Sequence, residues 1–249
     1  EEQIEDAVSR LTHGAVPTSE VGGGIGDQIL EALGVVVPAV ELVEGIPARR
    51  RGADAVGAPL AQLAPKPLLV GDLAGHHADF WQVTGDALDF ALGSLKIACP
   101  GLRERLMNLY LSIAAFPEVP DALQKLKNAG LQTAILSNGT PAMLDAAVAN
   151  AGLEHMLDAV LSVESVGVFK PHPSVYQLAT DHFKVAPERI CFLSSNGWDA
   201  FSAKAFGFRV LWCNRFAQAP ERIPAAPDGE LMNLSQLPAW LNACSDPAV

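Results

Sequence analysis

The chain has 249 residues, 49% of them hydrophobic, and a formal net charge of −11. A chain of this length buries one substantial core, or one core plus a smaller appended domain. The acidic balance argues against binding nucleic acid or an anionic membrane through a broad basic surface. The net charge does not exclude the binding of small anionic substrates, because a few positive groups inside a pocket can outweigh a negative exterior.

The cysteines and the N-terminal residues indicate the cellular compartment of the protein. Four cysteines are scattered without CxxC spacing, which favours thiols in a reducing cytosol. No basic leader with an apolar stretch opens the chain, and no apolar run approaches the length of a membrane span. We therefore expect a cytoplasmic protein.

The two halves of the chain differ in how clearly they predict structure. Residues 1–77 contain runs of glycine and of arginine with weak periodicity, and they predict no fold. Residues 78–112 repeat apolar side chains at helical spacing and predict helices, which can form a cap. From residue 118 onward, strand and helix patterns alternate, which implies a parallel sheet covered on both faces. Strands are predicted at 134–136, 159–162, 190–193 and 210–212, and helices at 120–130, from 141 and at 174–183.

Polar clusters follow three of these strands, at the sheet edge where such folds bind ligands. Ser137-Asn138 offers a hydroxyl, an amide and backbone N–H groups to a carboxylate or phosphate oxygen, although Ser-Asn-Gly is also good turn sequence. Lys170 precedes a proline and offers one ammonium group; the alternative is an ordinary surface lysine. Segment 194–199 gathers polar side chains that suit the positioning of water and the orientation of a carboxylate, although Asp199 at its end can simply cap the following helix.

Together, segments 135–139, 168–173 and 194–199 resemble the second, third and fourth motifs of the haloacid dehalogenase superfamily, in its (S)-2-haloacid dehalogenase branch. The similarity extends over about residues 72–240. It implies an α/β fold, with a Rossmann-like parallel-sheet core and a helical cap domain. The implied core is residues 1–36 and 117–249, and the implied cap is residues 37–116.

The fourth motif separates two chemistries of this superfamily. Its phosphatases need Mg²⁺ and place two acids beside the nucleophile. Here Ser194-Ser195-Asn196 replaces the first acid and only Asp199 remains, so a hard cation would lose much of its oxygen charge. The resemblance therefore implies hydrolysis of (S)-2-haloalkanoic acids to (R)-2-hydroxy acids through an ester on a carboxylate, with no metal and no cofactor.

The resemblance also assigns roles to residues of this chain. The carboxylate of the substrate would be held by Ser137 and Asn138, and Lys170 would balance the charge of the nucleophile. Trp198 would line the apolar side of the pocket, or pack as an ordinary core residue. The implied substrate-binding residues are Ser137, Asn138, Tyr176 and Trp198. The implied catalytic residues are Lys170, Ser194, Asn196, Asp199 and, as nucleophile, Glu31.

Glu31 stands where the chain departs from the family. The family begins with a strand followed by Asp-x-Tyr-Gly-Thr, whose aspartate is the nucleophile, and this motif is absent. The nearest in-register stretch is 29–35, with Glu31 in place of the aspartate; Asp6 and Asp27 are weaker candidates. Glutamate is one methylene longer, and a near-attack arrangement tolerates little misplacement.

The Leu-Trp-Arg and Tyr-Ser/Thr-Trp motifs of the family's cap are absent as well. Segment 59–62, back-translated as CCT CTG GCG CAA, reads Leu-Trp-Arg one base later, and segment 69–71, as CTC GTG GGA, reads Ser-Trp in the same shifted frame. We hypothesise that part of residues 1–71 reflects a displaced reading frame. Resequencing the gene and finding the written frame intact would reject this hypothesis.

Two other functions stay open from the sequence. One is a Mg²⁺-dependent phosphatase or phosphonatase of the same superfamily. The other is a catalytically impaired relative that only binds small carboxylates, because the nucleophile motif is missing. In the leading interpretation the partner is a small halogenated carboxylic acid, not nucleic acid or a membrane, and a homodimer is left open by the resemblance.

Overall fold

The computed structural model describes residues 75, 77–94, 96–220 and 222–245. These residues fall into two compact units, with the division between Ser112 and Ile113. The domain assignment of a core at 1–36 and 117–249 and a cap at 37–116 stays a prediction, because much of it falls outside the described residues.

The described part of the first unit is helical, as its periodicity predicts. It contains α5 (Phe80–Ser94) and α6 (Leu102–Leu109). Leu88 on α5 and Leu106 on α6 belong to one buried apolar cluster, so the two helices bury their apolar faces together. The rings of Phe80 and Tyr110 meet edge to face, with centroids 6.4 Å apart.

The second unit contains parallel strands in two groups. In the first group, β1 (Ala134–Ser137) pairs with β2 (Ala159–Ser162). In the second group, β3 (Cys191–Ser194) pairs with β4 (Arg209–Cys213), and β4 pairs with β5 (Gly229–Leu231). The four predicted strands are confirmed to within a residue or two, whereas β5 was not predicted. All described pairings are parallel, as the alternation of strands and helices implies.

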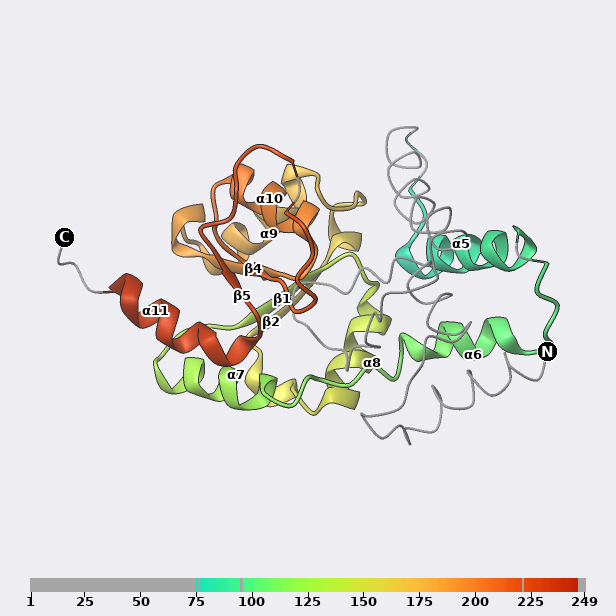
Figure 1. The fold of residues 1–249 in the computed structure, drawn as a ribbon, viewed down its shortest axis with the longest axis horizontal. Coiled ribbons are helices and arrows are strands. Elements are labelled where there is room, and N and C mark those ends of the chain that lie inside the picture. The colour runs from blue at the N-terminus through green and yellow to red at the C-terminus, as the bar shows by residue number, and fades with distance from the viewer. Residues whose placement is uncertain (1–74, 76, 95, 221, 246–249) are drawn as a thin grey trace. The chain divides into compact units, whose positions relative to one another are not determined.

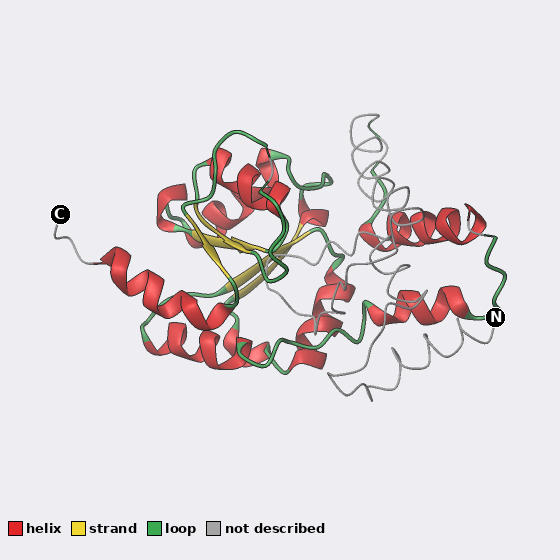
Figure 2. Cartoon of the chain, viewed as in Figure 1, coloured by secondary structure: helices red, strands yellow, loops and turns green. Residues whose placement is uncertain are grey.

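Helices cover both faces of these strands, so the predicted α/β layering is confirmed (Figures 1 and 2). Two helices lie on one face, α9 (Pro173–Phe183) and α10 (Gly197–Phe206). Three lie on the other, α7 (Val119–Asn128), α8 (Pro141–Ala151) and α11 (Leu237–Ser245). Among the helices of the described residues, none is both long and apolar enough to span a membrane.

Local signals explain where the helices beside the strand ends begin. Thr140 caps α8 by accepting a hydrogen bond from the backbone N–H of Met143, and Pro141 occupies the first turn. His172 caps α9 in the same way, with Ser174 N–H as donor and Pro173 in the first turn. Each cap follows directly on a polar cluster, so helix starts and candidate site residues meet at one edge of the sheet.

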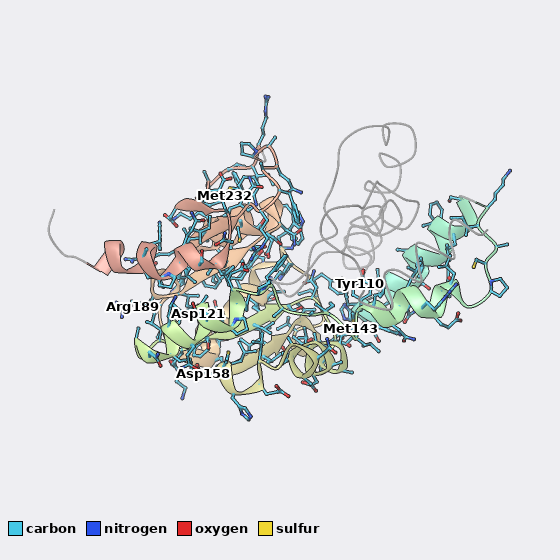
Figure 3. All side chains as sticks on the ribbon, turned by 60° about the horizontal axis from the view of Figure 1, so that its bottom comes forward. Tyr110, Asp121, Met143, Asp158, Arg189 and Met232 are labelled. Atoms are coloured by element: carbon cyan, nitrogen blue, oxygen red, sulfur yellow. The ribbon has the colours of Figure 1, made fainter. Side chains whose placement is uncertain are left out.

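Asp158 lies at the opposite edge of the sheet, where the strands begin, directly before β2 (Figure 3). Its Oδ2 accepts a hydrogen bond from Thr133 N–H at 2.8 Å, and its Oδ1 accepts one from Lys127 Nζ at 2.6 Å. The hydrogen bond from Lys127 and that from the Thr133 backbone hold the pKa of Asp158 below its ordinary value of 3.8. Asp158 therefore ties α7 to the starts of β1 and β2.

This contact makes a prediction about the pH dependence of stability. A carboxylate with a lowered pKa in the folded state contributes stability above its unfolded pKa, and this contribution is lost as the pH falls through the folded pKa. We expect Asp158→Asn to lower the free energy of unfolding at neutral pH, and the difference from the wild type to shrink as the pH falls below 3.8. Urea denaturation at a series of pH values measures this.

Asp121→Asn is the matched control, because Asp121, which is labelled in Figure 3, forms an exposed ion pair with Lys125 within α7. It should change stability less at neutral pH, since exposed pairs contribute little. A difference between Asp158→Asn and the wild type that stays constant with pH would contradict the assigned role of the carboxylate.

Candidate active site

The three polar clusters meet at the carboxyl ends of β1 and β3. Ser137 and Ser194 are the last residues of these two strands. Lys170 lies before α9, and Asp199 lies in the first turn of α10. Segments far apart in the sequence thus supply one site, as the sequence predicts for the ends of parallel strands.

Asp199 is the centre of the hydrogen bonding, with 2% of its surface exposed. Its Oδ2 accepts from Lys170 Nζ at 3.0 Å and from Ser194 Oγ at 2.9 Å. Its Oδ1 accepts from the hydroxyl of Tyr176 at 2.8 Å. The helix cap considered for Asp199 is wrong, because Asn196 holds the cap position of α10 and the Asp199 carboxylate binds these three donors.

Lys170 is a buried cation, so its alternative interpretation as a surface lysine is wrong. Its side chain is 2% exposed, and its ammonium group lies 4.8 Å from the ring centroid of Phe192. Burial lowers the pKa of Lys170, and the charge of Asp199 and the hydrogen bond to it offset part of this effect. Charged groups away from water need such partners.

Tyr176 keeps its proton in this environment. It is 1% exposed, and burial raises the pKa of its hydroxyl well above the ordinary value. The negative charge of Asp199 and the hydrogen bond to it raise the pKa further. Tyr176 is therefore a neutral donor that orients the Asp199 carboxylate.

Ser137 and Asn138 are buried, at 0% and 3% exposure. Asn138 Oδ1 accepts a hydrogen bond from Lys170 N–H at 3.0 Å, and Ser137 Oγ accepts one from Gly139 N–H at 2.9 Å. These contacts use neither the O–H of Ser137 nor the side-chain N–H groups of Asn138, which are donors of the kind that bind a carboxylate oxygen.

The turn after β1 is fixed on both sides of Gly139. Ser162 at the end of β2 donates its hydroxyl to the carbonyl of Gly139 at 2.7 Å. A Cβ atom at Gly139 would lie 3.1 Å from Cδ2 of Leu144 and 3.3 Å from Oγ of Ser137. The absence of a side chain at Gly139 therefore allows Leu144 and Ser137 to approach the backbone closely.

The remaining predicted residues lie around Ser194. Its hydroxyl oxygen accepts a hydrogen bond from Asn196 N–H at 3.2 Å while it donates to Asp199. Asn196 and Trp198 are half-buried, and neither of them contacts Asp199 by a hydrogen bond within the described residues. The structure thus joins Ser194 directly to the charged pair and places Asn196 one hydrogen bond away.

The candidate nucleophile Glu31 lies outside the described residues, as do Asp6, Asp27 and the segment 59–71 of the reading-frame hypothesis. No group of three or more His, Cys, Asp or Glu side chains in the described part of the chain could hold a metal ion. The sequence reasoning missed Phe192, whose ring contacts Lys170. Phe192 lies in the apolar run 190–193 of the sequence, and that run indicates only a buried strand.

A protein-family model spans all three motif segments. The family model for haloacid dehalogenase-like hydrolases matches residues 54–207. (S)-2-haloacid dehalogenase 1 of Pseudomonas sp. (strain CBS-3) is 43% identical over 170 residues, which are 68% of this chain and 75% of that protein. (S)-2-haloacid dehalogenase 4A of Burkholderia cepacia is 42% identical over 166 residues, 66% of this chain and 72% of that protein.

A solved structure agrees with these relatives. The L-2-haloacid dehalogenase from Xanthobacter autotrophicus superposes with a TM-score of 0.73 at 29% identity, covering 97% of this chain and 93% of that chain. The chain therefore belongs to the haloacid dehalogenase-like hydrolase family. The resemblance inferred from the three motifs and the Rossmann-like α/β core are both confirmed.

The buried pair of Lys170 and Asp199 makes a prediction about stability. We expect Asp199→Asn to reduce the free energy of unfolding by about 3–5 kcal/mol, because it leaves the buried ammonium group without an anionic partner. Urea denaturation measures the change, and Asp145→Asn, on the exposed side of α8, serves as control. Equal, small effects of the two substitutions would contradict a charge-compensating role for Asp199.

Proposed function

We propose that this protein hydrolyses the carbon–halogen bond of (S)-2-haloalkanoic acids to give (R)-2-hydroxyalkanoic acids. The observation that carries the proposal is the buried ammonium–carboxylate pair of Lys170 and Asp199 beside the donors of Ser137 and Asn138. The relatives that are 42–43% identical are (S)-2-haloacid dehalogenases. A small carboxylic acid carries the charge that such donors bind.

The proposed reaction has two steps. A carboxylate of the enzyme attacks C2 of the substrate opposite the halogen, so that a carbon–oxygen bond forms as the carbon–halogen bond breaks and halide leaves. Water then attacks the carbonyl carbon of the resulting ester. The acyl–oxygen bond breaks, the enzyme carboxylate is regenerated, and the 2-hydroxy acid leaves with C2 inverted. Neither step requires a cofactor.

The roles follow from charge and hydrogen bonding. Ser137 and Asn138 would bind the substrate carboxylate, and Lys170 would compensate the negative charge that nucleophile and substrate bring together. Ser194 and Asp199 would keep the ammonium group in place through the hydrogen bonds described above. Asn196 would position the hydrolytic water, and Trp198 would line the apolar side of the pocket.

Asp199 is poorly suited to be the nucleophile itself. Both of its oxygens accept hydrogen bonds, from Lys170 and Ser194 on Oδ2 and from Tyr176 on Oδ1. These bonds lower the electron density that an attack on carbon needs. The nucleophile is therefore another carboxylate, and Glu31 is our candidate from its position in the sequence.

The proposal includes the cellular setting. The net charge of −11 supports a small-molecule substrate in preference to nucleic acid or a membrane surface. We propose action in the cytoplasm, with a homodimer as one assembly to be tested by sedimentation.

The proposal predicts the outcome of a direct assay. Purified protein with EDTA present should release chloride from (S)-2-chloropropionate and not from the (R) form, as measured by ion chromatography. Ser137→Ala should lower kcat/KM about 10- to 100-fold, because a hydrogen bond to a charged group contributes about 1.5–3 kcal/mol. Ser235→Ala, whose exposed hydroxyl bonds to Asn233, should leave the rate unchanged.

Other outcomes point to the other functions. Phosphate release that depends on added Mg²⁺ would support the phosphatase. No halide release from a folded protein that still binds chloropropionate would support the catalytically impaired relative. In that case, the same assay on a gene with the family-like reading frame restored over residues 1–71 separates a dead enzyme from a displaced frame.

A further inference from the structure

Four aromatic side chains pack together beneath the charged pair, and we refer to them as the aromatic cluster: Tyr176, Phe192, Phe206 and Phe208. The ring of Phe192 meets Tyr176 at 89° with centroids 5.9 Å apart, and meets Phe208 at 37° with centroids 5.7 Å apart. Phe192 is 6% exposed and Phe208 is 0% exposed. Contacts on several sides therefore fix the orientation of the Phe192 ring.

Phe192 differs from the rest of the aromatic cluster because it contacts the cation. The Lys170 ammonium lies over its ring, 4.8 Å from the centroid. The face of an aromatic ring carries partial negative charge, and its attraction for a cation grows when both are removed from water. Lys170 meets that condition, with a side chain that is 2% exposed.

The other groups around the ammonium and its carboxylate partner come from three elements. Asp199 on α10 accepts its hydrogen bond, and Ser194 at the end of β3 shares the same carboxylate oxygen. Tyr176 on α9 reaches the pair through the other oxygen of Asp199. Among the described residues, Asp199 is the one charged group that contacts the ammonium. The ring of Phe192 adds a second, uncharged source of negative potential.

The aromatic cluster connects both members of the charged pair. Tyr176 holds Asp199 by its hydroxyl and packs its ring against Phe192. Phe192 in turn lies under Lys170. A displacement of the Phe192 ring would therefore affect the ammonium group directly, whereas a change at Phe208 would act only through packing.

We propose that Phe192 is a positioning residue for the dehalogenation reaction, whose ring face holds the Lys170 ammonium against Asp199 and keeps it a fixed positive charge. This inference rests on the proposed function, in which Lys170 compensates negative charge during attack. It adds a group that touches neither substrate nor nucleophile and acts through Lys170.

Graded fluorination of the ring tests this role in the full-length protein. Mono-, di- and trifluorinated phenylalanine at position 192 weaken the negative ring face in steps and leave the shape almost unchanged, so the variants should fold. The readout is the titration midpoint of Lys170, followed by NMR of lysine labelled with ¹³C at the ε carbon and assigned with K170R. We expect the midpoint to fall with each fluorine, by about one pH unit for the trifluorinated ring.

The same amino acids at position 208 are the matched control. Phe208 belongs to the aromatic cluster, and it has no contact with Lys170 among the described interactions. Fluorination there should leave the midpoint unchanged. The basic limb of the pH profile of kcat/KM for (S)-2-chloropropionate should shift to lower pH with fluorination at 192 and stay in place with fluorination at 208.

The two proposals fail in different ways. No shift of the Lys170 midpoint at 192, or equal shifts at 192 and 208, would overturn the role of Phe192 even if the wild type releases halide. Absence of halide release from the wild type would overturn the proposed function, and the midpoint measurement would still decide whether the Phe192 ring stabilises the charged lysine.

Discussion

Lys170 carries a positive charge inside the protein, and that charge needs compensation where it lies. A buried ammonium group without partners loses its proton or destabilises the fold. Asp199 supplies the opposite charge, and Tyr176 and Ser194 hold its carboxylate in position. The arrangement of β1, β3, α9 and α10 around the strand ends can be understood as the scaffold that brings these groups together.

The same constraint connects stability with chemistry. A charge that is already in position before the reaction needs little rearrangement during it. Enzymes stabilise developing charge in this way. The cost appears instead in the folded state, where ammonium and carboxylate both leave water. In the proposed function, donors on Ser137 and Asn138 beside this pair bind the carboxylate of the substrate.

The fold of residues 118–213 was predictable because each strand is a short apolar run and most helices begin or end at proline or glycine. β5 was not predicted, since a strand of three residues with Glu230 at its centre lacks an apolar run. At the site, motif positions predicted Lys170 and Asp199, but not that Asp199 binds three donors. The contact of Phe192 depends on tertiary packing, so its place in an ordinary apolar strand gave no sign of it.

The network around Asp199 also bears on how this protein can change over evolutionary time. Its members come from separate segments of the chain, and the hydrogen bonds from Lys170, Ser194 and Tyr176 all end on the carboxylate of Asp199. Residues that share one network have non-additive effects when substituted. Epistasis should therefore be strong here: a lineage that loses Asp199 gains little by keeping Lys170 or Tyr176, and these positions are expected to be retained or replaced as a set.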